Sequence, residues 1–260
     1  MADLTYHDTI ELLRRLQGTG VEVVIVGGQA VNFWAEQFRH RVPELAESGS
    51  FTSKDIDLLG DRDAVEACAA SLHGRSFLPD PFEPTPNSGA VVFHDSSGMK
   101  VEIDFLRQVF GVDEADIQRT KIPIEILDEQ GRATAIRFWV MQPVLCMESR
   151  ACNVVGLPGH DTPHARRQLQ ASIYCAREFL RDLLAAERAR EVLRLNERIF
   201  GFCTKDPIGR RVFQQTGMDP FDAVIAETPL PARFLTQRYP QMRSHLDRLR
   251  SRWASMSPPR

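Results

Sequence analysis

The sequence predicts an α+β protein, with a mixed β-sheet and covering helices in its first half and an all-helical second half. Three observations predict this fold. Runs with the two-residue alternation of half-buried strands lie before residue 141, and apolar residues with helical spacing dominate after Pro143. A content of 43% hydrophobic and 26% charged residues is that of an ordinary globular protein, and 260 residues can form two cores. We therefore expect domains at residues 1–141 and 142–260.

The elements of the first half follow from changes in apolar spacing and from turn residues. Helical spacing after Asp8 ends at Gly18 and Gly20. The segments expected next are a strand at Val21–Val26, a helix at Gln29–Phe38 and a loop or short excursion at 39–53. They are followed by a strand ending at Leu59, a helix capped by Asp61 and ending near Leu72, and a proline-rich loop at Pro79–Pro86. Two hairpins follow, which pair Gly89–His94 with Met99–Leu106 and Ile122–Leu127 with Ala133–Val140.

The second half carries long amphipathic patterns. They predict helices at Thr162–Phe200, Pro207–Gln215 and Pro240–Trp253. Near the start of the first of these, two positions are open to Arg166, Arg167 and Gln168: the cleft or the solvated face of the helix. They are assigned to the solvated face, because polar residues of a surface helix mostly face water.

Charge and cysteine content exclude several classes of protein. The formal net charge of -3 argues against a general nucleic-acid coat. No apolar run reaches membrane length, and the polar opening lacks the regions of a signal peptide, so a cytoplasmic protein without membrane contact is expected. The cysteines form no Cys-x-x-Cys pair and are expected to be reduced, buried thiols; they are Cys68, Cys146, Cys152, Cys175 and Cys203.

A pair of glycines ends the first apolar strand. Gly27 and Gly28 follow Val23-Val24-Ile25-Val26 and precede a helical pattern, so they mark a strand-to-helix turn. The N-terminus of a helix after glycines is a natural phosphate site, because free backbone N–H groups and the helix dipole both favour an anion there.

Acidic residues alternate with apolar ones on two later strands. Asp55 and Asp57 are two apart and face one side of the strand, while Ile56 and Leu58 face the core. Carboxylates this close repel one another unless a cation lies between them, and Mg²⁺ is the cation that suits few carboxylates, water and phosphates. Asp104 would complete the acidic cluster if its strand lies beside theirs, as a metal ligand or as the base for an acceptor hydroxyl.

The order Gly27-Gly28, then Asp55-Ile56-Asp57, then Asp104 resembles the nucleotidyltransferase superfamily typified by DNA polymerase β and kanamycin nucleotidyltransferase. The motif Thr52-x-x-Asp55-Ile56-Asp57-Leu58, together with a helical second half, is similar to nucleotidyltransferases of the abortive-infection toxin type. The resemblance implies that Asp55, Asp57 and Asp104 hold two magnesium ions. It also implies that Gly27, Gly28 and Thr52 contact a nucleoside triphosphate, with Arg150 in place of a phosphate-binding lysine.

These residues predict transfer of a nucleoside monophosphate from a nucleoside triphosphate to an acceptor hydroxyl or phosphate, with release of pyrophosphate. The acceptor stays open between RNA or tRNA, as in a toxin controlled by an antitoxin protein, and a small molecule. An alternative of another class is a non-catalytic nucleotide-sensing or partner-binding protein on the same fold. Glu102, on the same face as Asp104, is interpreted as a neighbour of the site and not as a ligand.

Overall fold

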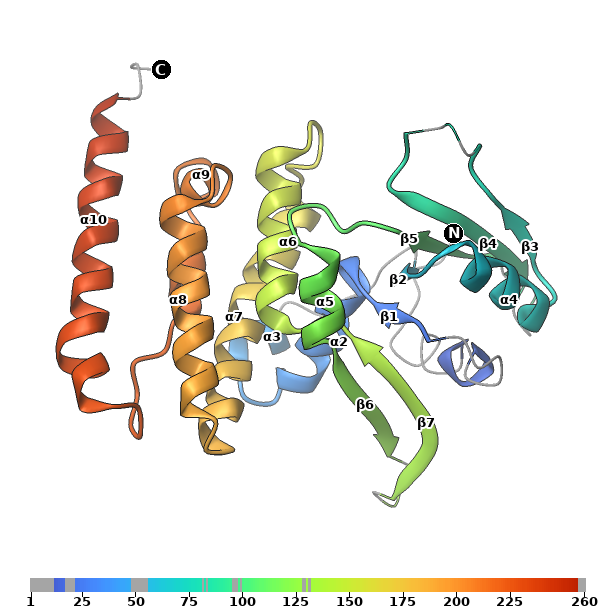
Figure 1. Ribbon diagram of the computed structural model, residues 1–260, viewed down its shortest axis with the longest axis horizontal. Coiled ribbons are helices and arrows are strands. Elements are labelled where there is room, and N and C mark those ends of the chain that lie inside the picture. Colours follow the sequence, from blue (N-terminus) through green and yellow to red (C-terminus); the bar gives the residue numbers. More distant parts are fainter. Residues whose placement is uncertain are drawn as a thin grey trace.

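The computed structural model describes residues 12–16, 22–47, 56–80, 82, 84–94, 98, 100–127, 130 and 132–256. Strands and helices mix up to Val140, and every element described after it is a helix (Figure 1). The protein is therefore of mixed α and β structure, as the sequence predicts. None of the helices in this described part combines the length and apolar character needed to cross a bilayer.

The strands form one mixed sheet of seven in the order β3-β4-β5-β2-β1-β7-β6. Their bounds are Val24–Ile25 (β1), Ile56–Leu59 (β2), Arg75–Phe77 (β3), Asn87–His94 (β4), Lys100–Leu106 (β5), Ile122–Leu127 (β6) and Ala133–Val140 (β7). Both expected hairpins are confirmed, since β4 pairs with β5 and β6 pairs with β7 in antiparallel fashion. Between the hairpins, β2 pairs with β5 and β1 pairs with β7 in parallel, and β1 and β2 pair with each other in antiparallel fashion.

The helices depart from expectation in several places. Their bounds are Gly27–Phe38 (α2), Pro43–Glu47 (α3), Arg62–Leu72 (α4), Glu114–Thr120 (α5), Pro143–Gly156 (α6), Pro163–Ala185 (α7), Ala189–Lys205 (α8), Gly209–Thr216 (α9), Pro220–Ala223 (η1), Phe234–Arg238 (η2) and Tyr239–Met256 (α10). The expected helix at Thr162–Phe200 is wrong, because the chain turns between α7 and α8, where Glu187 adopts a positive φ of 59°. The segment expected as a loop or short excursion at 39–53 contains the short helix α3 in its described part, residues 39–47.

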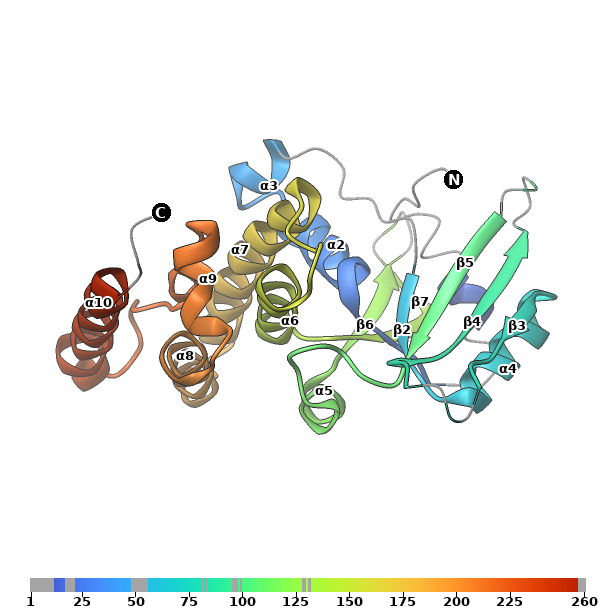
Figure 2. The same ribbon diagram turned by 90° about the horizontal axis from the view of Figure 1, so that it is seen from above.

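The helices after β7 extend away from the sheet. Helix α2 packs against β2 on one side and against α6 and α7 on the other. From there α8 and then α10 follow in a row, so that α10 lies at the end of the molecule farthest from β3 (Figures 1 and 2). Helix α2 is consequently the element through which the glycine turn of the sheet meets the helical half.

Two clusters of buried apolar residues stabilise the molecule, and α6 and α7 contribute to both. On α6, Leu145 and Cys146 belong to the cluster of the sheet, whereas Val144, Met147 and Ala151 belong to the cluster among the later helices. The change of architecture falls at the end of β7, close to the expected boundary at residue 141. A division into domains 1–141 and 142–260 stays a prediction, because the two cores meet along the same helices.

The cysteines are confirmed as free and buried. Burial raises the pKa of the Cys68, Cys146 and Cys152 thiols to about 12. Because the thiolate is the reactive form, we expect the native protein to react with Ellman's reagent at pH 8 at least tenfold more slowly than the same protein in guanidinium chloride. Fast reaction of the native protein would show that at least one thiol is accessible.

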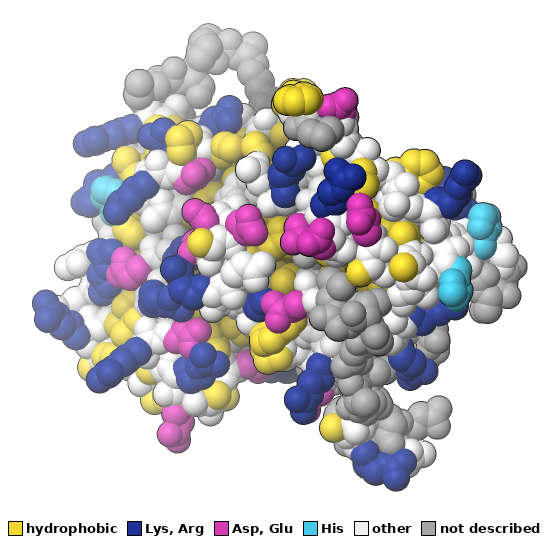
Figure 3. All heavy atoms as spheres, turned by 45° about the vertical axis from the view of Figure 1, so that its right-hand side comes forward, with side chains coloured by type: hydrophobic (Ala, Val, Ile, Leu, Met, Phe, Trp, Pro, Cys, Tyr) yellow, Lys and Arg dark blue, Asp and Glu magenta, His cyan; other side chains and the backbone are white. Residues whose placement is uncertain are grey.

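Surface charges of both signs intermingle on the side that carries α4 and β3. Figure 3 brings this side forward and shows acidic side chains in a band across its middle, with Lys and Arg side chains around the band. The described part of this face therefore offers no continuous basic surface to a polyanion.

Candidate functional site

The two described aspartates of the predicted cluster lie side by side. Strands β2 and β5 are parallel, and the register places Asp57 directly opposite Asp104. Ile56, Leu58 and Ile103 are buried on one face of the sheet, and both aspartates are half-buried on the other. Adjacent strands are about 4.8 Å apart, so the two carboxylates can share one cation. The predicted neighbourhood of Asp57 and Asp104 is confirmed. Asp55 and Thr52 lie outside the described residues.

The glycine turn lies directly against Asp57. Strand β1 ends at Ile25, and the Val26 N–H donates to the Asp57 carbonyl at 3.0 Å. Gly27 then adopts φ +63° and begins α2, and a Cβ added to it would lie 1.9 Å from Asp57 Oδ2. Only glycine combines this backbone conformation with that close approach. The N-terminus of α2, which no side chain caps, therefore lies beside an aspartate of the cluster.

The next glycine touches a residue from the helical half. A Cβ added to Gly28 would lie 2.7 Å from Gln168 Nε2, on α7. Gln168 is only 5% exposed, so its assignment to the solvated face is wrong. The missed signal is its spacing: it lies four residues before the buried Ser172, on the face that α7 turns inward. Gln168 is the site residue that sequence reasoning did not select.

Arg150 completes the group. It lies on α6, and its Nη1 donates to Gln168 Oε1 at 3.3 Å. Its Nε is buried and has no hydrogen-bond partner among the described residues. Burial lowers the pKa of Arg150, and the Asp57 carboxylate acts in the opposite direction. A buried guanidinium with an unmet donor, next to a helix N-terminus, is an arrangement that favours an anion.

The need for glycine at position 27 can be tested by adding one methyl group there. Gly27→Ala is expected to lower the free energy of unfolding by about 1–2 kcal/mol from its positive φ alone, and to displace the Asp57 carboxylate besides. Gly201→Ala is the matched control. Gly201 lies inside α8 with nothing within 4 Å of its added Cβ, so this change should stabilise the protein by up to about 1 kcal/mol. Urea denaturation measures both, and equal effects would contradict the prediction.

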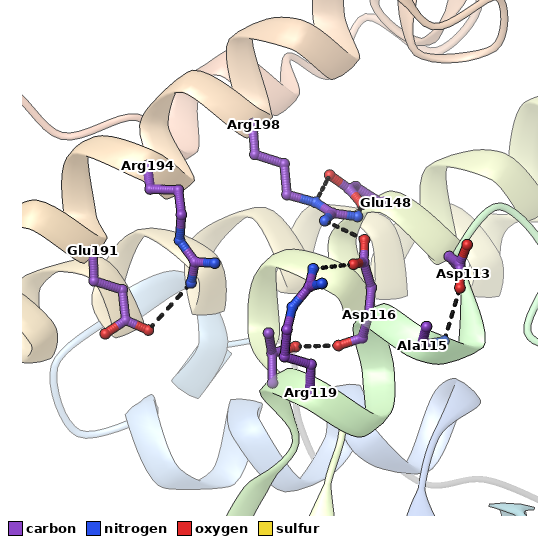
Figure 4. A network of polar contacts seen from close by, with 9 residues as sticks. Asp113, Ala115, Asp116, Arg119, Glu148, Glu191, Arg194 and Arg198 are labelled. Carbon is purple, nitrogen blue, oxygen red and sulfur yellow. Dashed lines mark hydrogen bonds and ion pairs between the residues drawn. The ribbon is translucent and has the colours of Figure 1, made fainter.

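An ion-pair network fixes α6, the helix that carries Arg150. Arg198 on α8 donates to both oxygens of Glu148 on α6, with Nε to Oε1 at 2.8 Å and Nη2 to Oε2 at 2.7 Å (Figure 4). Its Nη1 donates to Asp116 on α5 at 2.6 Å, and Arg119 pairs with the same aspartate. The network joins three helices, one of which, α5, lies in the segment that follows the strand of Asp104.

Comparison with known proteins adds little to this geometry. No model of a known protein family matches the chain, and no curated protein sequence matches it either. The chain is similar to a solved structure described as "Crystal structure of JHP933 from Helicobacter pylori". The two are 10% identical, the alignment covers 95% of each chain, and the TM-score is 0.33. A TM-score this low supports no conclusion about fold or activity.

Proposed function

We propose that the chain is a magnesium-dependent nucleotidyltransferase of the superfamily typified by DNA polymerase β and kanamycin nucleotidyltransferase. The observation that carries the proposal is the register of Asp57 opposite Asp104, with Asp57 against the Gly27 turn. On this proposal the sheet and its helices form the catalytic core. The helices from α6 onward form a helical domain that closes the site, of the kind found in abortive-infection toxin nucleotidyltransferases.

The described donors fit magnesium in kind. Carboxylate oxygens are its preferred protein ligands, and it keeps water and substrate phosphates as the others. No group of three metal-ligating side chains occurs among the described residues. The proposed site therefore needs Asp55 or phosphate oxygens beside Asp57 and Asp104. When bound, two magnesium ions would stabilise charge on the attacking and leaving oxygens.

The residues of the chain then have separate roles. Backbone N–H groups at the start of α2 and the Arg150 guanidinium bind the triphosphate. Asp104 accepts the proton of the acceptor hydroxyl while the hydroxyl oxygen forms its bond to the α-phosphorus. The bond from that phosphorus to the bridging oxygen of the β-phosphate breaks in the same step, so pyrophosphate leaves with the bonding electron pair.

The test is pyrophosphate release from each of the four ribonucleoside triphosphates with magnesium, with and without total cellular RNA. The parent is compared with the double variant Asp55→Ala/Asp57→Ala. Release by the parent that is lost in the double variant supports the proposal, and a dependence on RNA supports RNA as the acceptor class. Nucleotide binding without release under any condition would support the non-catalytic sensing or partner-binding alternative.

The toxin form of the proposal has its own test. If the acceptor is a tRNA, expression of the parent should arrest growth, and Asp57→Ala should relieve the arrest. Co-expression of a neutralising antitoxin protein would relieve it as well. Harmless expression of an enzyme that releases pyrophosphate in vitro would instead favour a small-molecule acceptor.

A further inference from the structure

Helix α6 carries a run of buried polar atoms that have no partner among the described residues. They are Ser149 Oγ, Arg150 Nε and Asn153 Oδ1. A buried polar atom left without a hydrogen bond costs about 1–3 kcal/mol, and such atoms are rare in folded proteins. Three of them within five residues therefore indicate a missing polar ligand. The triphosphate proposed above would accept a hydrogen bond from Arg150, but it has no donor for the oxygen of Asn153.

The spacing on α6 shows which way Asn153 faces. Cys146, Arg150 and Asn153 are separated by four and then three residues, so they follow one face of the helix. Cys146 belongs to the apolar cluster of the sheet, and the charge of Arg150 interacts with that of Asp57. Asn153 accordingly lies on the same face, one turn beyond Arg150.

The end of α6 is held beside the segment that follows β5. A Cβ added to Gly111 would lie 2.3 Å from Cys152 Sγ, and one added to Gly156 would lie 2.8 Å from the Phe110 ring. Cys152 and Gly156 flank Asn153, so its turn of α6 is packed against the connection from the Asp104 strand. Asn153 is thus fixed in position between a proposed phosphate contact and the chain leaving Asp104.

We propose that Asn153 binds a ribose hydroxyl of the nucleotide, and that the chain consequently selects ribonucleotides over their deoxy analogues. This inference rests on the proposed function, since it assumes that the triphosphate lies between Gly28 and Arg150. Side chains three apart on a helix have Cβ atoms about 5–6 Å from one another. One turn of α6 therefore leads from a phosphate contact to the sugar that is bonded to the α-phosphate.

A ribose hydroxyl can pair with the amide in either of its two orientations. The oxygen and nitrogen ends of an asparagine amide are assigned from their surroundings, so the unmet end can be the acceptor or the donor. A ribose hydroxyl can donate to the first or accept from the second. An exocyclic amino group only donates and a ring nitrogen without hydrogen only accepts, so each fits one orientation of the amide alone.

The test measures the affinity of the protein for nucleotides by calorimetry. Calcium replaces magnesium so that no turnover takes place. Each ribonucleoside triphosphate is compared with its 2′-deoxy and 3′-deoxy analogues. We expect the parent to bind one of the two deoxy forms at least tenfold more weakly, because the Asn153 amide would be left unpaired. Asn153→Leu should remove that preference, whereas Asn153→Asp, which keeps an acceptor, should retain it while binding all the nucleotides more weakly.

A second readout separates binding from folding. Because Asn153 Oδ1 makes no hydrogen bond in the described structure, Asn153→Leu should leave the melting temperature of the nucleotide-free protein unchanged or raise it. Equal affinity of the parent for the ribo and deoxy forms would overturn the inference. A preference for the ribo form that survives in Asn153→Leu would overturn it as well. Neither result would contradict the proposed function. Failure of every triphosphate to bind would overturn both.

Discussion

Asp57→Asn is expected to lower the rate of pyrophosphate release about a thousandfold or more. The amide has nearly the shape of the carboxylate, so the close contact with Gly27 is kept while one negative charge is lost. Loss of that charge weakens a ligand of the proposed magnesium site, whose stabilisation of the transition state amounts to several kcal/mol. A thousandfold change corresponds to about 4 kcal/mol. A pyrophosphate-release assay with magnesium and each nucleoside triphosphate measures it.

Asp104→Asn should act on the same reaction through the acceptor. Loss of a general base typically lowers a rate by about 10²–10⁴-fold. If Asp104 activates the acceptor and does not hold the nucleotide, its variant should keep magnesium-dependent nucleotide binding. The Asp57 variant should lose binding and turnover together, so the two aspartates can be told apart by calorimetry.

Glu102→Gln is the matched control for both aspartates. Glu102 lies on β5 two residues before Asp104, on the same face of the strand, and pairs with Lys100 at 3.5 Å. Glu102→Gln removes one negative charge from β5, as Asp104→Asn does. We nevertheless expect it to change the rate by less than about threefold, because an exposed ion pair contributes little energy. Equal losses in all three variants would mean that general charge on this face matters and that Asp57 and Asp104 have no special role.

The part of this site that the sequence predicts depends on local periodicity. Alternation along β2 and β5 places Asp57 and Asp104 on the polar face of a sheet, and a glycine pair between a strand and a helical pattern predicts the turn at Gly27. Neither inference needs knowledge of distant contacts. The turn residues indicate the hairpin of β4 with β5. The parallel pairing of β5 with β2, which brings Asp104 to Asp57, joins segments far apart in the chain and was only a condition of the prediction.

The rest of the site depends on contacts between segments far apart in the chain. Gln168 is polar and stands beside two arginines, so local composition favours water, whereas packing of α7 on α2 buries it. The break between α7 and α8 at Glu187 carries no glycine or proline, so nothing local ends the helical pattern. The partners of Arg198 are 50 and 82 residues away, and no spacing rule connects them.

Arg198→Met is expected to destabilise the protein by about 3 kcal/mol. Glu148 is 5% exposed on its side chain, and Arg198 occupies both of its oxygens. Removal of the guanidinium leaves a buried carboxylate without its counter-charge, which costs about 3–5 kcal/mol when the pair is fully buried. We take the lower figure because Arg198 is 31% exposed. For a chain of this size the melting temperature should fall by about 6–12 °C, which calorimetry measures.

The destabilisation should depend on pH in a definite direction. Burial raises the pKa of Glu148, and Arg198 opposes that rise in the parent. Without Arg198 the folded-state pKa of Glu148 lies farther above its unfolded value, so its ionisation costs stability at neutral pH, and the cost disappears as pH falls toward the unfolded value. The hydrogen bond from Arg198 lowers the pKa of Asp116, which stabilises the parent above the unfolded pKa of Asp116 and is lost as pH falls. The Asp116 effect is already complete at pH 5, so the Glu148 effect alone makes the parent and the variant differ more at pH 8 than at pH 5.

The double variant Arg198→Met/Glu148→Gln separates the charge from the packing. It leaves no ionisable group at position 148, so the Glu148 part of the pH dependence should disappear, and stability at pH 8 should rise above that of Arg198→Met alone. The Asp116 part is unchanged in the double variant, and it varies only as pH falls below about 5, toward the unfolded pKa of Asp116. If the two variants are equally stable at pH 8, the network holds α5, α6 and α8 through the methylene packing of Arg198, and the ion pair contributes nothing to the position of Arg150.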